Sequence, residues 1–447
     1  MSDQLLILIA LAGIFLLLFL VIRTKLHAFV ALLLVSLIVG ILAGMPLEEV
    51  INSMQSGMGG TLGFVAVVVG LGAMFGQMLE VSGGAERLAR TMIQKFGEGR
   101  AQWALGITGF LVAIPVFFDV GFIILVPIVY GLAKKTGRSL LYYGIPLLAG
   151  LAVTHSFIPP TPGPIAVADL IGAEIGWVIL FGAIAGVPAM IISGPLFAKY
   201  ISKRLHVVVP DYMNLEEVEY DKELPSFKLI SAIILTPLVL ILLNTFSGFL
   251  LEEGHIVRAI FTFLGHPFVA LTIATLLTFV FLGTKRGYSR QEVHDIANKA
   301  LEPAGIIILV TGAGGVFKQV LIDSGVGDVL GNMMAGSALP PLLLAFLIAA
   351  AVRVAQGSAT VSMVTAAGLM APLISILQLE GPVLGLMVIA IASGATVLSH
   401  VNDSGFWLVG RYFGLTVKDT LKTWTVMETL IGLVGLTVAL ILGMFII

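Results

Sequence analysis

The stretch VRVAQGSAT, residues 352–360, decides the fold, and it lies inside the longer segment 339–379. Apolar arms flank it at residues 340–352 and 361–377. A helix rises 1.5 Å per residue, so the first arm reaches only about 20 Å against a hydrocarbon core of about 30 Å. Irregular backbone at membrane depth persists only where protein buries it or water lines it. We therefore expect a re-entrant hairpin whose tip, Gly357 to Thr360, faces a binding cavity; the alternative is one kinked spanning helix.

The composition is that of a polytopic membrane protein. The chain has 447 residues, 58% hydrophobic and 11% charged, whereas about 25% of residues are charged in soluble domains. The chain contains no cysteine, which excludes disulfides and thiolate metal sites. It has no basic tract for nucleic acid and no H-E-x-x-H motif. Residues 312–315 are glycine-rich but lack the strand–turn–helix context of a dinucleotide loop. We expect no enzyme, no cofactor and no metal site.

Basic residues set the predicted topology. The first span, Gln4 to Ile22, is followed by Arg23 and Lys25, which the positive-inside rule places in the cytoplasm. The N-terminus is then outside, and a last span from Trp424 also ends outside. We predict about ten spans, both termini periplasmic, in the bacterial inner membrane.

A second hairpin is expected in the first half. Two short apolar arms, 103–118 and 120–133, surround Asp119, and basic loops lie both before and after them. The chain therefore enters and leaves on the same side, with the tip at Phe118 to Gly121. A pair of thin full spans also satisfies the charges, so the short arms favour the hairpin.

The two halves form an internal repeat. Eight identities share an offset of 242 residues within a 19-residue window, beginning with Gly70 and Gly312 and including Leu88 and Leu330. The order of parts also recurs: span, hairpin, broken span, closing span. The first repeat enters from outside and the second from inside, so the repeats are inverted, an arrangement that places a substrate site near the bilayer midplane.

Each half also contains a broken span. A proline-rich run at residues 158–164 interrupts the first, because proline lacks the amide donor that a helix needs. The second is expected at residues 401–417. Thr154 and His155 at the first break correspond to Ser399 and His400 at the second.

The sequence predicts five consecutive units along the chain. The predicted units are a two-span segment (1–56), a first inverted repeat (57–201) with hairpin 101–133, a cytoplasmic linker (202–227), two connecting spans about 228–250 and 256–282 with a basic loop (228–299), and a second repeat (300–447) with hairpin 339–379.

Two charged residues in the hairpins are candidates for chemistry. Asp119 is a lone carboxylate between apolar arms; it is either a proton carrier, because ionisable groups inside the membrane are costly and usually functional, or a cap on the following half-helix. Arg353 either pairs with an anionic substrate, which the guanidinium fork suits, or is a structural clamp on backbone carbonyls of the opposing half, because a buried arginine is usually satisfied by protein groups.

Polar groups at the breaks complete the predicted site. Gly357, Ser358 and Thr360 offer amides and hydroxyls that suit an anion at a half-helix N-terminus, or a small cation. His155 and His400 are either proton switches or ties across each break. The predicted substrate residues also include Gly121, Thr154, Thr161 and Asn402, and Asp403 joins the predicted proton-coupling residues. Lys318 and Glu428 are interpreted as ends of spans.

These stretches resemble the gluconate permease family of bacterial inner-membrane symporters. The residues that carry the resemblance are Met45-Pro46-Leu47, Gly59 to Gly63, Gly70 to Met74, Thr154-His155-Ser156, Pro159-Pro160, Pro162-Gly163-Pro164, Gly312 to Ser324, Gly357 to Val361, Ser399 to Asp403 and Gly405-Phe406-Trp407. They span essentially the whole chain.

The resemblance implies proton-coupled uptake of gluconate or a related sugar acid, often by a dimer with an elevator-like transport domain. Two positions depart from many members: Thr161 replaces a histidine, and Asp119 replaces a glutamate. Members also carry idonate, fructuronate or D-serine, and sodium coupling and a channel are rival mechanisms. We expect a small anionic substrate, protons and the lipid bilayer as partners, and a homodimer.

Overall fold

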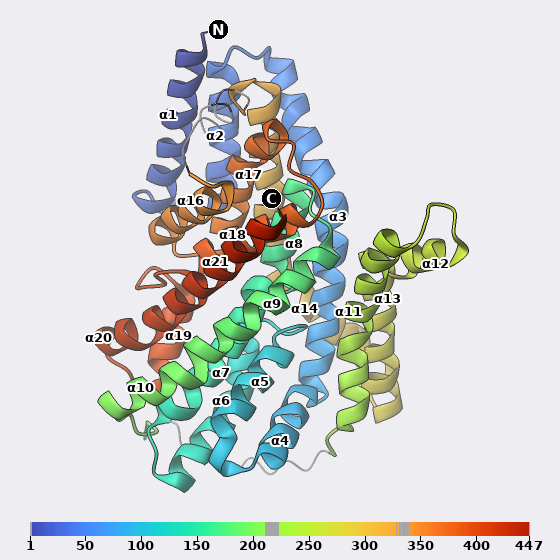
Figure 1. Cartoon of the computed structure of the whole chain (residues 1–447), viewed down its shortest axis with the longest axis vertical. Coiled ribbons are helices and arrows are strands. Elements are labelled where there is room, and N and C mark those ends of the chain that lie inside the picture. The colour runs from blue at the N-terminus through green and yellow to red at the C-terminus, as the bar shows by residue number, and fades with distance from the viewer. Residues whose placement is uncertain (1, 211–222, 328, 330–331, 333–338, 447) are drawn as a thin grey trace.

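The protein is described by a computed structural model that covers residues 2–210, 223–327, 329, 332 and 339–446 (Figure 1). Across these residues the regular secondary structure is helical, which confirms the all-α fold class. Nine helical stretches among them are long and apolar enough to cross a membrane. Part of the predicted linker, residues 211–222, and Leu330 of the repeat lie outside the described residues.

Two long helices form the spine of the molecule. Helices α3 (Leu47–Val81) and α14 (Arg290–Asp323) run side by side over much of their length, and at 35 residues α3 is about 52 Å long. Their close approach depends on glycine: a Cβ at Gly57 would lie 2.5 Å from the carbonyl oxygen of Gly315, and one at Gly315 would lie 2.6 Å from that of Gly57.

Both spine helices begin earlier than the sequence predicted. The predicted boundaries at residues 56/57 and 299/300 therefore fall inside continuous helices, which is a correction. Pro46 caps α3, and two glutamates in its first turn stabilise a helix N-terminus through the dipole. A capping box between Ser289 and Glu292 begins α14 inside the predicted basic loop, because it satisfies two free amides at once.

The two predicted hairpins appear as helix pairs joined at short breaks. In the first half these are α5 (Ala101–Val112) and α6 (Phe118–Thr136), and in the second α16 (Pro341–Gln356) and α17 (Ala359–Ile376). The first break is at residues 113–117, not at Phe118 to Gly121 as predicted. Pro115 accounts for this correction, since proline disrupts a helix interior, and Phe118 to Gly121 then form the first turn of α6.

The broken spans follow each hairpin. In the first half α7 (Leu140–Phe157) ends before the prolines and α8 (Pro162–Ile171) begins within them, with Pro162 at the first helical position, where its missing amide costs nothing. In the second half α18 (Pro382–Thr396) and α19 (Ser404–Phe413) leave residues 397–403 outside helices, earlier than the predicted 401–417.

Matched glycines support the repeat. A Cβ at Gly150 of α7 would collide with the carbonyl oxygen of Gly106 on α5, and one at Gly394 of α18 would collide with that of Phe346 on α16. The same contact between a hairpin arm and a broken span therefore occurs in both halves.

The closing span of each half contains a π-helical turn. Helices α9 (Ile175–Ile191) and α10 (Phe197–Arg204) are joined by a π-helical turn at residues 192–196, and α20 (Val417–Thr420) and α21 (Val426–Ile446) by one at residues 421–425.

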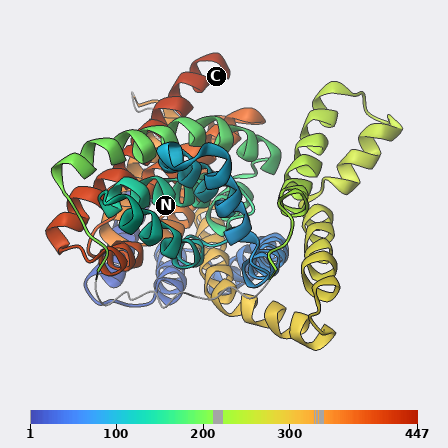
Figure 2. The ribbon, with the colours of Figure 1, turned by 90° about the horizontal axis from the view of Figure 1, so that it is seen from below.

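The remaining helices lie around this centre. Helices α1 (Asp3–Ile22) and α2 (Ala28–Leu42) pack together at one end, and α4 (Gly84–Phe96) packs against α5. Figure 2 shows α11 (Phe227–Leu250), α12 (Ile256–Leu264) and α13 (Pro267–Thr278) standing to one side. The predicted span 256–282 is corrected at its start: Gly265 ends α12, Pro267 begins a new helix, and the candidate span is Pro267–Arg286.

Candidate substrate site

A cavity of about 500 Å³ opens where the breaks of the two halves meet. Its walls come from the start of α6, the end of α7, α14, the α16–α17 break, residues 402–405 and α21. Its lining residues are Phe117, Phe118, Asp119, Val120, Ala152, His155, Ser156, Pro303, Ile307, Arg353, Gln356, Gly357, Ser358, Ala359, Thr360, Asn402, Asp403, Ser404, Gly405, Trp424 and Glu428. The volume falls in the usual range for small-molecule sites, about 300–1,000 Å³.

The α16–α17 break is built by two residues. Gly357 has φ +85°, and a Cβ there would collide with the backbone oxygen of Asn402, so only glycine fits both the left-handed conformation and the contact. Ser358 then caps α17: its Oγ accepts the amide of Val361 at 3.4 Å. The N-terminal turn of α17, with its free amides, consequently faces the cavity, as Thr360 and Ala359 in the lining show.

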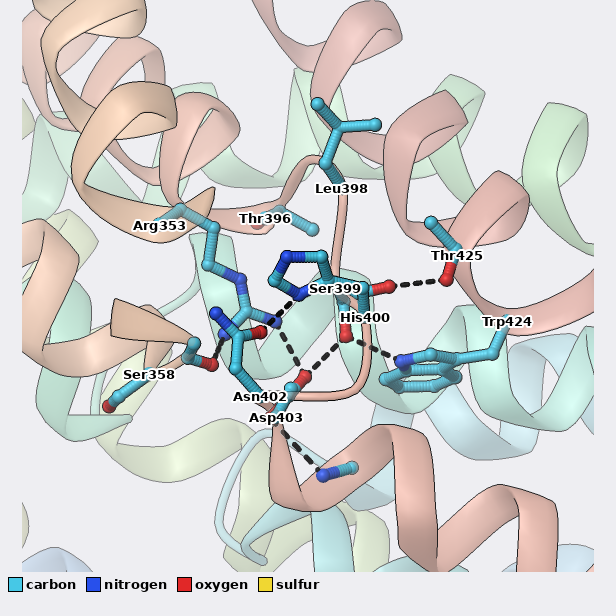
Figure 3. A network of polar contacts seen from close by, with 12 residues as sticks. Arg353, Ser358, Thr396, Leu398, Ser399, His400, Asn402, Asp403, Trp424 and Thr425 are labelled. Atoms are coloured by element: carbon cyan, nitrogen blue, oxygen red, sulfur yellow. Dashed lines mark hydrogen bonds and ion pairs between the residues drawn. The ribbon is translucent and has the colours of Figure 1, made fainter. Parts of the chain in front are cut away.

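Arg353 is the central cation of the cavity. It is 3% exposed, and its Nη2 donates to Oδ2 of Asp403 at 2.6 Å while its Nη1 donates to the carbonyl oxygen of Gly357 (Figure 3). Its Nε is buried and has no partner among the described residues. The guanidinium therefore holds together parts of its own half, Gly357 and Asp403, and not the opposing half as the clamp alternative supposed; it keeps one donor unused at the cavity.

Asp403 is held by donors from three directions (Figure 3). Its Oδ1 accepts the amide of Gly405 at 3.2 Å, which caps α19, and its Oδ2 also accepts from Ser399 Oγ. Ser399 in turn accepts from Trp424 Nε1 at 2.6 Å. The network ties the second broken span to both Arg353 and the π-helical turn before α21.

His400 contributes indirectly. Its Nδ1 is paired with Oδ1 of Asn402, and Asn402 Nδ2 donates to the carbonyl oxygen of Val354 at 2.9 Å. Asn402 lines the cavity, whereas His400 does not. In this arrangement His400 orients an amide that faces the cavity.

The first half supplies the opposite wall. The ring of Phe117 meets that of His155 edge-on, with 6.3 Å between the ring centroids. The rings of Phe118 and Trp424 pack with their centroids 5.2 Å apart. His155 Nδ1 is buried without a partner in the described part of the chain. Asp119 lies in the first turn of α6, whose N-cap is Phe117, and its side chain is exposed.

Eight of the residues predicted for the site line this cavity: Asp119, His155, Arg353, Gly357, Ser358, Thr360, Asn402 and Asp403. Four do not. Gly121 is buried against Leu151, Thr154 is fully buried, and Thr161 donates to the carbonyl oxygen of Ile158 at 2.6 Å; His400 is the fourth.

Sequence reasoning left several polar residues of the lining out of the site, among them Gln356, Trp424 and Glu428. Trp424 lies in the π-helical turn at residues 421–425, and Glu428 follows one helical turn later on α21; π turns are frequent at functional sites. The side-chain amide of Gln356 is buried with neither its oxygen nor its nitrogen paired in the described residues. A carboxylate within an apolar span was the signal for Glu428.

A family profile described as GntP family permease matches residues 5–445. The chain belongs to this family. It is 45% identical over 441 residues to a low-affinity gluconate transporter of Escherichia coli, with 99% of each chain covered. It is also 42% identical over 445 residues to a gluconate permease of Pseudomonas aeruginosa, covering 99% of this chain and 98% of the relative.

Family membership confirms the resemblance found in the sequence and settles the class: the chain is a permease and not an enzyme. It is also 44% identical over 446 residues to an inner membrane permease of Escherichia coli, covering 97% of this chain and 98% of the relative. With the nine candidate spans, this confirms the predicted multi-pass location in the bacterial inner membrane.

Solved transporter structures share the permease's fold. The YdaH transporter of Alcanivorax borkumensis superposes with a TM-score of 0.67 at 14% identity, covering 93% of this chain and 98% of that one. MtrF of Neisseria gonorrhoeae gives the same TM-score and identity, with 92% and 93% covered. At this identity the likeness concerns the fold alone.

Proposed function

We propose that this permease imports gluconate or a related sugar acid by proton symport. The observation that carries the proposal is Arg353, a buried guanidinium with a free Nε at a cavity formed by the helix breaks of both halves. Relatives named for gluconate and, at 42% identity over 427 residues, for L-idonate support this class of substrate.

The substrate carboxylate is proposed to bind at Arg353 and the first turn of α17. A guanidinium and the amides of a helix N-terminus both favour an anion. The hydroxyl groups of the sugar acid would meet Gln356, Ser358 and Asn402, whose polar groups line the cavity. The aromatic wall of Phe117, Phe118 and Trp424 would exclude water from the other side.

The transport cycle is proposed to move the two hairpins and broken spans as a unit past the rest of the protein, as an elevator. The matched contacts of α5 with α7 and of α16 with α18 are consistent with such a unit. Periplasmic termini, the domain units with the corrected starts of α3 and α14, and a homodimer belong to the same proposal.

Counterflow in proteoliposomes tests the substrate class. Vesicles loaded with unlabelled gluconate are expected to accumulate labelled gluconate transiently, and excess L-idonate should compete better than D-serine. Counterflow of D-serine but not of gluconate would keep the permease and replace its substrate. No counterflow of any of these compounds would contradict the proposal.

A further inference from the structure

We propose that Glu428 binds the coupled proton and that it responds to the substrate through Arg353. This inference rests on the proposed symport of a sugar acid. It assigns a coupling role to a carboxylate that lies outside the residues predicted from the sequence.

The geometry of Glu428 differs from that of every other acid at the cavity. The residue lies on α21, lines the cavity, and is only 4% exposed. Its Oε1 is buried and accepts no hydrogen bond from the described residues. A carboxylate oxygen held away from water without a donor is costly while it is charged, so this position suits an acid that gains and loses a proton.

The other titratable groups around Glu428 are differently placed. Asp403 accepts hydrogen bonds from Arg353, Ser399 and the amide of Gly405. Asp119 on α6 is exposed. The nearby histidines are His155 on α7 and His400, the latter paired with Asn402; α9 and α18, which also pack against α21, contain no titratable residue.

Charge balance links this acid to the substrate. Glu428 interacts electrostatically with both Arg353 and Asp403, and Arg353 is the only lysine or arginine among the described lining residues. Arg353 is already paired with Asp403. A substrate carboxylate at Arg353 therefore adds a second negative charge beside the same guanidinium. Protonation of Glu428 offsets that charge, so proton and substrate each favour the binding of the other, as linkage requires.

The test counts protons taken up when gluconate binds. Isothermal titration calorimetry of the purified full-length permease is run in buffers of different ionisation enthalpy, on wild type, Glu428→Gln and Glu428→Asp. The matched control is Glu80→Gln, because Glu80 is a half-buried carboxylate on α3 outside the cavity that is paired with Gln77.

Wild type and Glu80→Gln are expected to take up roughly one proton per gluconate, with affinity falling about tenfold per pH unit where the acid is ionised before binding. Glu428→Gln should bind gluconate without proton uptake and with affinity independent of pH. Proton uptake by Glu428→Gln equal to that of wild type would overturn the inference while leaving symport intact.

Two further outcomes keep the test decisive. If Glu428→Gln is not recovered folded, Glu428→Asp decides, since it retains an acid and should retain proton uptake; binding without uptake in this variant contradicts the assignment. If wild type binds no sugar acid, the proposed function fails, and the inference fails with it.

Discussion

At the scale of single residues, the guanidinium of Arg353 is the group on which substrate binding depends. Arg353→Lys keeps the positive charge but loses the fork that reaches Asp403 and Gly357 together. A lost hydrogen bond to a charged group costs roughly 1.5–3 kcal/mol, which is about 10- to 150-fold in gluconate affinity. Counterflow rates and binding titrations measure the loss, with Arg138→Lys, outside the cavity, as control. Wild-type affinity in Arg353→Lys would contradict the assignment.

For Asp119, the sequence and the structure lead to different expectations. If Asp119 were the proton carrier, the first of the two alternatives from the sequence, Asp119→Asn would abolish uphill uptake. Its exposed position in the first turn of α6 instead leads us to expect reduced but proton-driven accumulation, because the coupled proton binds at Glu428. Uptake of labelled gluconate under a pH gradient decides between them: complete loss, with exchange retained, would return the role to Asp119.

The chemistry of the side chains at the site could be predicted from the sequence, but their neighbours in the folded protein could not. Arg353, Ser358 and Asn402 could be found because polar groups interrupt apolar segments. Glu428 was overlooked because its position near a span end has an ordinary explanation, and only the packing of α21 against the α16–α17 break brings it to the cavity. Gly121 was included as part of the predicted tip, and Thr161 as part of the proline break; in the structure Gly121 packs against Leu151 and Thr161 donates to the carbonyl oxygen of Ile158.

At the scale of helices, the break between α16 and α17 depends on Gly357. Gly357→Ala forces a Cβ into the left-handed region and against Asn402, a strain of roughly 1–3 kcal/mol. We expect a lower melting temperature and weakened gluconate binding. Gly59→Ala on α3 is the control, since its Cβ meets no atom within 4 Å. Equal melting temperatures in the two variants would show that the break tolerates a side chain.

The spine offers a second test at this scale. Gly315→Ala places a methyl group against Thr61 and the backbone of Gly57, so α3 and α14 must separate, and we expect destabilisation of about 1–3 kcal/mol. Gly305→Ala, on the same helix with open space around it, should be neutral or slightly stabilising. Thermal unfolding monitored by size-exclusion chromatography compares them; a neutral Gly315→Ala would contradict the close packing.

Helix boundaries were the part of the fold that sequence patterns predicted least well. The hairpin arms and proline breaks follow from residues that cannot continue a helix. The starts of α3 and α14 were predicted too late, although Glu48 and Glu49 favour a helix N-terminus at the start of α3 and Ser289 with Glu292 forms a capping box at the start of α14. Capping was the physical effect left out.

At the scale of the whole molecule, the two halves use the same construction: a short-armed helix pair, a broken span held by a glycine contact, and a closing helix with a π turn. The cavity forms where their breaks converge, as expected for inverted repeats. Inversion could be inferred from basic loops and an internal repeat, but which residues converge requires the packed structure.

Coupled import of a sugar acid by this permease can be measured as uptake driven by protons alone. Purified permease in proteoliposomes is given labelled gluconate with an imposed inward proton gradient and no sodium. We expect labelled gluconate to accumulate above its external concentration, and this accumulation to collapse when a protonophore is added. Downhill entry that ignores the protonophore, or accumulation that appears only when sodium is supplied, would contradict it.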